Sequence, residues 1–259
     1  MRPVPLALFA ALISASPLAA ENTRPKLFGV TIGVGALAAH DAEDFAAILL
    51  RQKGPLYSDV SVKTLTQADA SRAHMLAALA WLQEQVTPRD VGVLLIAGAG
   101  GGDDRQNLWF PAAAAPENRL LGDEIRVAIS ASKGKSVLFL DVCRADPSAG
   151  GEAQKACSID MNRLVNDLTT GQSKVVVFAA SQGHEIAQEN PEWGHGAFGA
   201  ALIEAVGEGK ADFMGSRMIK LTNLDVYLAE RVKQLTDGGQ NPLMVRPVTV
   251  PDFALARGP

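Results

Sequence analysis

The sequence predicts one α/β domain built on a doubly wound, mostly parallel sheet with helices on both faces. Short apolar runs rich in β-branched residues alternate with amphipathic segments along nearly the whole chain. Several of these runs are continuously apolar, as strands buried on both faces of a parallel sheet must be. Strands that alternate with helices form right-handed βαβ crossovers, and roughly 240 residues after a short leader suit a single core.

Each element is expected where its pattern is clearest. The strands are expected at 26–33, 60–65, 91–97, 136–140 and 173–180, followed by an extended segment at 243–250 that contains a proline. The helices are expected at 41–51, 71–85, 122–132, 159–169, 196–206 and 223–235, the second capped by Ser71. The segments 112–116 and 146–154 are predicted surface loops, and the residues after Pro251 a loose tail.

The first twenty residues have the pattern of a secretory signal peptide. Met1-Arg2 is positive, Val4–Ile13 is apolar, and small residues lead to a predicted cleavage after Ala20. The apolar run is too short to span a bilayer, and no later segment is long enough. The sequence thus predicts an exported protein, periplasmic or secreted, with a domain at 25–247 and a tail at 248–259.

Composition argues against several functions. The net charge is −4 and aromatic residues make up 5% of the chain. Nucleic-acid binding, which needs a basic face or stacking aromatics, is therefore not expected. Two cysteines are too few for a disulfide framework or a zinc cluster. We expect no cofactor and no required metal, and we interpret Asp103-Asp104 as solvated acids rather than calcium ligands.

Two expected strand ends carry residues of chemical interest. In an open parallel sheet, sites form beyond the carboxyl ends of the strands. One end is Ala97–Asp103, whose glycines lack the Lys-Ser/Thr of a phosphate-binding P-loop, so a flexible loop is the simpler interpretation. The other end is Leu140–Arg144, where charged residues flank Cys143 and indicate that the chain is leaving the core.

These two ends, with three further segments in the right order, resemble the caspase and metacaspase group of cysteine peptidases in its small bacterial exported form. Ile96–Gly100 is similar to the strand end Ser-Gly-His-Gly of that group, and Leu140–Arg144 to its Asp-x-Cys-His/Arg. Also similar are the first-helix acidic segment Asp41–Asp44, the strand and loop Val176–Gly183, and the helix start Glu192–Phe198. The resemblance covers residues 26–247 and implies a caspase–haemoglobinase-like fold.

The resemblance implies a role for each matching residue. Cys143 is the implied nucleophile, which must react as a thiolate. The implied general base is replaced by Ala99, whose methyl group cannot move a proton. The N–H groups of Gly100 and Cys143 match the oxyanion hole. Asp141 matches an acid that lines a pocket for Arg or Lys side chains, although a strand-end carboxylate could equally cap the next turn.

Only four histidines could replace the missing base. His40, expected in the loop after the first strand, and His74 are interpreted as polar surface residues. His195 lies in a Gly-His-Gly triplet at a helix start, follows no expected strand, and is interpreted as unrelated to the site. His184 follows the strand 173–180 and is the one plausible substitute.

Three functions therefore remain open. The first is a pseudopeptidase that binds a peptide or protein ligand. The second is an Arg/Lys-directed endopeptidase that uses His184, and the third is an unrelated flavodoxin-like binding module. A disulfide between Cys143 and Cys157, which would stabilise the fold by roughly 3 kcal/mol, would also block the nucleophile.

Overall fold

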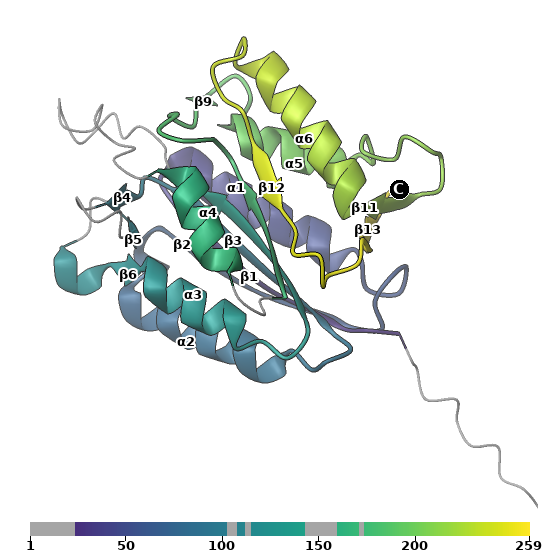
Figure 1. The fold of residues 1–259 in the computed structure, drawn as a ribbon, viewed down its shortest axis with the longest axis horizontal. Helices are drawn as coiled ribbons and strands as arrows, with labels where there is room; N and C mark the ends of the chain where they lie inside the picture. Colours follow the sequence, from purple (N-terminus) through teal and green to yellow (C-terminus); the bar gives the residue numbers. More distant parts are fainter. Residues whose placement is uncertain (1–23, 103–107, 112–114, 143–159, 171–173) are drawn as a thin grey trace, which may run out of the picture.

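The computed structural model describes residues 24–102, 108–111, 115–142, 160–170 and 174–259. Its centre is a six-stranded sheet in the order β12-β8-β7-β3-β1-β2 (Figure 1). These strands are β1 (Leu27–Val34), β2 (Val60–Thr66), β3 (Val91–Gly98), β7 (Lys135–Asp141), β8 (Val175–Ala179) and β12 (Leu243–Val245). All neighbouring pairs are parallel except β12 with β8, which confirms the predicted mostly parallel sheet.

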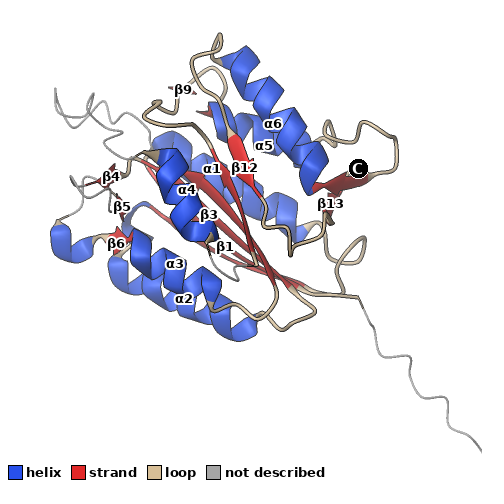
Figure 2. Cartoon of the chain, in the orientation of Figure 1, coloured by secondary structure: helices blue, strands red, loops and turns tan. Residues whose placement is uncertain are grey.

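Helices cover both faces of this sheet, as Figure 2 shows. One face packs against α1 (Ala36–Leu50), α5 (Ala197–Gly207) and α6 (Leu221–Leu235). The other packs against α2 (Arg72–Gln85), α3 (Gly122–Ser130) and α4 (Met161–Thr169). Alternate residues of β7 serve the two cores: Phe139 faces α1 and α5, whereas Leu140 faces α2 to α4. This two-sided burial is the physical reason for the continuous apolar strands.

Three small sheets were not anticipated, because their strands are too short to give a periodic pattern. The first contains β4 (Gly101–Gly102), β5 (Leu108–Phe110) and β6 (Leu120–Leu121). The second pairs β9 (Glu189–Asn190) with β10 (His195–Gly196), and the third pairs β11 (Met218–Lys220) with β13 (Ala254–Arg257). Short 3-10 turns occupy Gln67–Asp69 and Pro116–Asn118.

The chain after Pro251 is not loose, so the prediction for this segment was wrong. Strand β13 pairs antiparallel with β11, and both Leu255 and Ala256 are fully buried. The buried Tyr57 hydroxyl also donates to the Leu255 carbonyl at 2.9 Å. The last residues belong to the core under α5 and α6, because they supply apolar side chains that this face of the sheet would otherwise lack.

Two further differences concern element boundaries. Helix α1 starts at Ala36, so His40 lies inside the helix and not in the loop before it. The extended segment 243–250 forms a strand only at Leu243–Val245. The predicted loop 146–154 and most of the loop 112–116 lie outside the described residues, as does the predicted signal peptide. In the described part of the chain, no helix has the length and apolar character needed to cross a membrane.

Candidate active site at the carboxyl edge of the sheet

The ends of β3 and β7 lie side by side, as the site prediction requires. Ala97 is in register with Asp141, and beyond them the Gly100 N–H donates to the Val142 carbonyl at 2.5 Å. Glycine is needed at Gly98, where φ is +138° and a Cβ would come within 2.4 Å of the Val34 carbonyl oxygen. This close approach holds the half-buried Ala99 at the edge of the sheet beside the end of β7.

The Gly100 N–H has an internal partner in this structure. It was expected to stabilise an oxyanion, and it donates instead to the Val142 carbonyl. It could therefore meet an oxyanion only after that bond opens, because an N–H carries a single proton. Cys143 and Cys157 lie outside the described residues, so the nucleophile, its own N–H and the possible disulfide stay predictions.

Asp141 is buried at the end of β7. Side chains alternate along a strand, and Asp141 follows Phe139 by two residues, so it points to the face covered by α1 and α5. The residues that follow Val142 lie outside the described part of the chain, so both roles of Asp141, pocket acid and cap of the next turn, stay predictions.

A carboxylate–imidazole pair lies on that same face. Asp41, buried in the first half of α1, has its Oδ1 2.8 Å from His195 Nδ1. The other imidazole nitrogen, Nε2, is 3.6 Å from Asp44 Oδ2, and the Gly196 N–H donates to Asp41 Oδ2 at 3.5 Å. His195, which we interpreted as unrelated to the site, lies in the two-residue strand β10 against α1, directly before the start of α5. The strand was not expected, and the role of His195 stays a prediction.

An aromatic cluster accompanies these polar residues. The Phe139 ring contacts those of Phe45, Phe178 and Phe198, with centroids 5.2, 5.1 and 6.5 Å apart. Asp141 follows Phe139 by two residues on β7, and Asp41 precedes Phe45 by about one turn on α1. His195 of β10 lies three residues before Phe198 of α5. The two buried carboxylates and the imidazole therefore lie close in sequence to rings of this cluster.

The signal that could have revealed this pair was present in the sequence. Asp41 and Asp44 are three residues apart, so they share a helix face and can both reach one cation or imidazole. Sequence reasoning used them only as part of a resemblance, because nothing local shows that β10 would return to this helix. The contact joins residues 154 positions apart.

The other histidines are placed as follows. His40 Nδ1 lies 3.3 Å from the Gly194 carbonyl oxygen, and His74 Nδ1 lies 3.0 Å from that of Asp69. His184 is exposed in the loop after β8, and β8 is bonded to β7 through the Ala180 N–H and the Leu140 carbonyl. His184 is therefore on a loop that leaves the carboxyl edge next to β7, as predicted.

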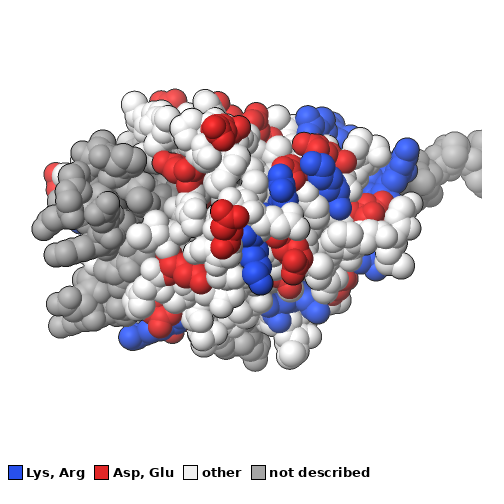
Figure 3. Space-filling view, turned by 90° about the horizontal axis from the view of Figure 1, so that it is seen from above, with Lys and Arg blue, Asp and Glu red and all other residues white. Residues whose placement is uncertain are grey.

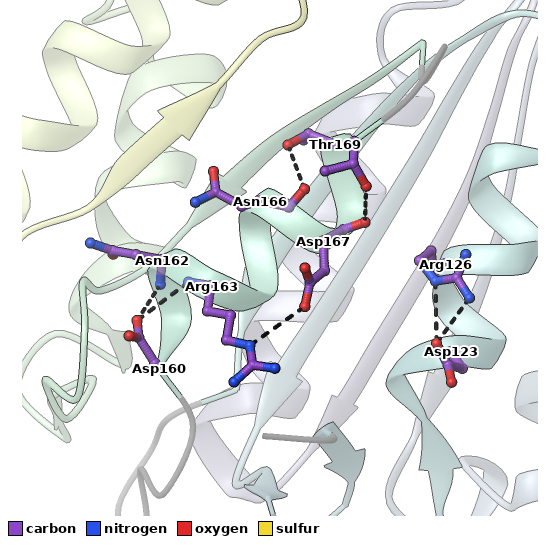
Figure 4. A network of polar contacts seen from close by, with 9 residues as sticks. Asp123, Arg126, Asp160, Asn162, Arg163, Asn166, Asp167 and Thr169 are labelled. Carbon is purple, nitrogen blue, oxygen red and sulfur yellow. Dashed lines mark hydrogen bonds and ion pairs between the residues drawn. The ribbon is translucent and has the colours of Figure 1, made fainter. Parts of the chain in front are cut away.

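The start of α4 fixes this loop. The Met161 N–H donates to the Gly183 carbonyl at 2.8 Å, and the Gly183 N–H donates to Asn162 Oδ1 at 3.1 Å. Asp160 caps the helix by accepting from the Asn162 and Arg163 N–H groups, and Arg163 faces Asp167 one turn later (Figure 4). His184 thus follows a residue with two backbone anchors.

A metal centre is not apparent at this edge. Within the described ranges, no three His, Cys, Asp or Glu side chains are placed so that they could hold a metal ion together. Asp103 and Asp104, which we interpreted as solvated, lie outside those ranges.

The strand order and the helices on both faces (Figure 2) define a doubly wound α/β protein. A family model described as the caspase domain matches residues 36–251, and the chain belongs to this family. The flavodoxin-like alternative is therefore abandoned.

Solved structures share this fold. A protein from Geobacter sulfurreducens, GSU0716, superimposes with a TM-score of 0.61 at 16% identity, over 91% of this chain and all of the other. Caspase-1 from Spodoptera frugiperda gives a TM-score of 0.58 at 10% identity, over 91% of this chain and 94% of the other. At these identities the likeness concerns the fold alone. A sequence search of curated proteins gave no match.

Proposed function

We propose that this caspase-domain protein is an exported pseudopeptidase that binds a peptide or protein ligand at the carboxyl edge of its sheet. The observation that carries the proposal is Ala99, which stands at the end of β3 beside the end of β7. The base of a cysteine peptidase must stand within hydrogen-bonding reach of the reacting groups. A methyl group at that place cannot accept the proton of Cys143.

The size of the expected defect supports this proposal. General acid–base catalysis contributes typically about 10²–10⁴-fold to a rate. Loss of one partner from a coupled nucleophile–base unit can reduce kcat by around 10⁶-fold. His195 is poorly suited to compensate, because carboxylates of Asp41 and Asp44 face its two ring nitrogens.

The charge of the edge supports a basic ligand. Asp41 and Asp141 are buried on the same face, and Asp44 adds an exposed carboxylate. A Lys or Arg side chain would gain charge-assisted hydrogen bonds from such a pocket. We therefore propose a ligand that presents Arg or Lys, held in part by Asp141.

Restoring the base tests the catalytic half of the proposal. The variant A99H should gain Cys143-dependent cleavage of fluorogenic peptides with Arg or Lys before the scissile bond, and A99H/C143A should not. The unaltered chain should be inactive. Cleavage by the unaltered chain that C143A abolishes would contradict the pseudopeptidase proposal.

Ligand binding is tested separately on the C143A chain. A peptide with an internal Arg should bind, and D141N should weaken that binding by about tenfold, the size of one charge-assisted hydrogen bond. D123N is a matched control, since Asp123 is an exposed acid on α3 that pairs with Arg126. Equal binding by D141N and D123N would exclude Asp141 from the pocket.

A second candidate is an active Arg/Lys-directed endopeptidase that uses His184. It is favoured by one observation, the direct pairing of β8 with β7, which brings the loop of His184 to the same edge as the end of β7. Here the unaltered chain should cleave basic peptides, and H184A should abolish the activity while H74A leaves it intact. Activity that persists in H184A would eliminate this candidate.

Export and the redox state of the cysteines are part of the proposal. Intact mass spectrometry of the protein recovered from a bacterial periplasm should give a chain that begins after Ala20. A non-reduced digest of the same sample should then be searched for a peptide pair linked through Cys143 and Cys157. A full-length chain retained in the cytoplasm would contradict export, and a linked pair would explain inactivity by a blocked thiol.

A further inference from the structure

A pocket of about 360 Å³ lies between the C-terminal end of α1 and the residues at the end of β13. Helix α1 starts just after the carboxyl end of β1, so its last turn lies toward the opposite edge of the sheet. The walls come from the end of α1, the end of α5, the loop before β11 and the residues around Arg257. The pocket therefore lies away from Ala99 and Asp141.

Three arginines line the pocket. Arg51, Arg217 and Arg257 come from three different parts of the chain, and no acidic side chain is among the lining residues. The terminal residue Pro259 also lines the pocket and brings one carboxylate. None of the three guanidinium groups forms an ion pair with a carboxylate of the described residues, whereas Arg72, Arg126 and Arg231 each do. On the face shown in Figure 3, most Lys and Arg side chains lie in the half of the molecule that contains β11 and β13, with Asp and Glu side chains between them.

The backbone at two of these arginines is fixed by specific bonds. The Arg257 N–H donates to Gln52 Oε1 at 2.7 Å, and Gln52 Nε2 donates to the Arg257 carbonyl at 3.3 Å. Gln52 is only 4% exposed, so this pairing is protected from water. The guanidinium of Arg257 therefore projects from a well-defined point at the rim.

Arg217 has a left-handed backbone, with φ of +60°. Its N–H donates to Asp212 Oδ2 and its carbonyl accepts from the Gly258 N–H at 2.9 Å. A non-glycine residue in this region is uncommon and persists only where the surroundings impose it. Asp212 accepts hydrogen bonds from the backbone N–H of Arg217 and from the N–H and hydroxyl groups of Ser216. Its oxygens are therefore used within its own loop.

Three arginines against the single carboxylate of Pro259 give this pocket a net positive lining in a chain whose net charge is −4. The carbonyl end of α1 attracts cations and so accounts for Arg51, but Arg217 and Arg257 come from a loop and a strand. Guanidinium groups match phosphate oxygens in a bidentate geometry. A single carboxylate would neutralise one of the three charges, whereas a phosphate ester or diphosphate neutralises two or more.

We propose that this pocket binds a phosphate-bearing anion through Arg51, Arg217 and Arg257. Its volume falls in the range of small-molecule sites and exceeds that of one phosphate group, which favours a diphosphate or a phosphate on a larger molecule. The site does not depend on the peptidase chemistry, because no residue of the carboxyl edge lines it.

The test uses inorganic pyrophosphate as the probe and isothermal titration calorimetry on the chain without a C-terminal tag. The unaltered protein should bind it saturably, and R51Q, R217Q and R257Q should each weaken binding by about tenfold or more, as expected for one charge-assisted contact. R126Q is the matched control, an exposed arginine that lies on α3 and outside the pocket. Thermal melts of each variant would verify that the fold is intact.

The proposal fails if pyrophosphate does not bind, or if R126Q weakens binding as much as the pocket variants do. Two arms identify the source of the phosphate. Co-sedimentation with phosphatidylglycerol vesicles that pyrophosphate competes away and R257Q abolishes would assign a lipid headgroup. Pyrophosphate binding without co-sedimentation would assign a soluble phosphate compound.

Discussion

The two ends of helix α1 carry opposite charge and differ in how they are built. Near its start, Asp41 is buried and held by His195 and the Gly196 N–H. Just after its end, Arg51 is exposed beside two further arginines. The first environment is fixed by close packing against α5, and the second by loops and the last strand. Burial makes the acidic end sensitive to small changes in shape, whereas exposure lets the basic end accept a ligand.

The largest expected effect comes from the strand that supports the basic end. L255A should lower the free energy of unfolding by about 2–4 kcal/mol, because Leu255 is fully buried and the change leaves a cavity. Urea denaturation measures it. The control V248A changes a fully exposed residue in the segment before β13, and its effect on the free energy of unfolding should stay within about 0.5 kcal/mol. Equal effects of the two variants would mean that β13 does not belong to the core.

The second prediction compares the two ends of α1 through glycines of α5. A Cβ at Gly199 would lie 2.1 Å from Asp41 Oδ1, whereas a Cβ at Gly207 would meet the flexible end of Ile48 at 2.8 Å. G199A should therefore destabilise the protein by about 2–3 kcal/mol through overpacking, although alanine ordinarily favours a helix.

G207A is the matched control on the same helix. Its effect should stay within about 1 kcal/mol, because the gain in helix propensity offsets a small displacement of Ile48. Chemical denaturation of both variants measures the difference. If G199A leaves the free energy of unfolding unchanged, α1 and α5 can separate near Asp41, and the acidic end of α1 is not closely packed.

The third prediction concerns charge at the acidic end. D41N should lower stability by about 1–2 kcal/mol, because His195 and the Gly196 N–H meet different oxygens of Asp41, and asparagine replaces one of these with an NH2 group that cannot accept. D44N should change it by less than about 0.5 kcal/mol, since the Asp44 side chain is 59% exposed. Thermal and urea denaturation at neutral pH would check both, and the reverse order would place the buried contact at Asp44.

The smallest effect is expected away from both ends of α1, at the contact between α5 and α6. There Glu204 of α5 accepts hydrogen bonds from Tyr227 and Arg231 of α6. Burial raises the pKa of Glu204, but the hydrogen bonds from Arg231 and Tyr227 outweigh it, and the net shift is downward from 4.5. A lowered folded-state pKa gives stability that is present above the unfolded value and is lost as the pH falls through the folded one.

Y227F tests this contribution. It should cost about 1 kcal/mol at pH 7, the loss of one hydrogen bond to a charged acceptor. The variant should also lose less stability than the unaltered chain as the pH falls below 4.5, since its Glu204 pKa lies closer to the ordinary value. Urea denaturation at several pH values would measure both, and parallel pH curves would contradict the assigned shift.

The sequence by itself determined the main sheet, its helices and the place of the candidate site. Continuous apolar runs such as Val91–Gly98 follow directly from burial on both faces, and the end of a parallel strand is a fixed place in the fold. The residues Ala99 and Asp141 could be located for that reason. Strands of two to four residues left no pattern, and so β10 and β13 were missed.

Only the tertiary structure decided which distant side chains meet. His195 pairs with Asp41 across 154 residues, and the three arginines of the basic pocket come from positions 51, 217 and 257. Local propensity and periodicity describe one element at a time, whereas these contacts depend on how α1, α5 and the last strand pack around one core. This packing brings His195 to Asp41 near the start of α1, and it brings Arg217 and Arg257 to Arg51 just after its end.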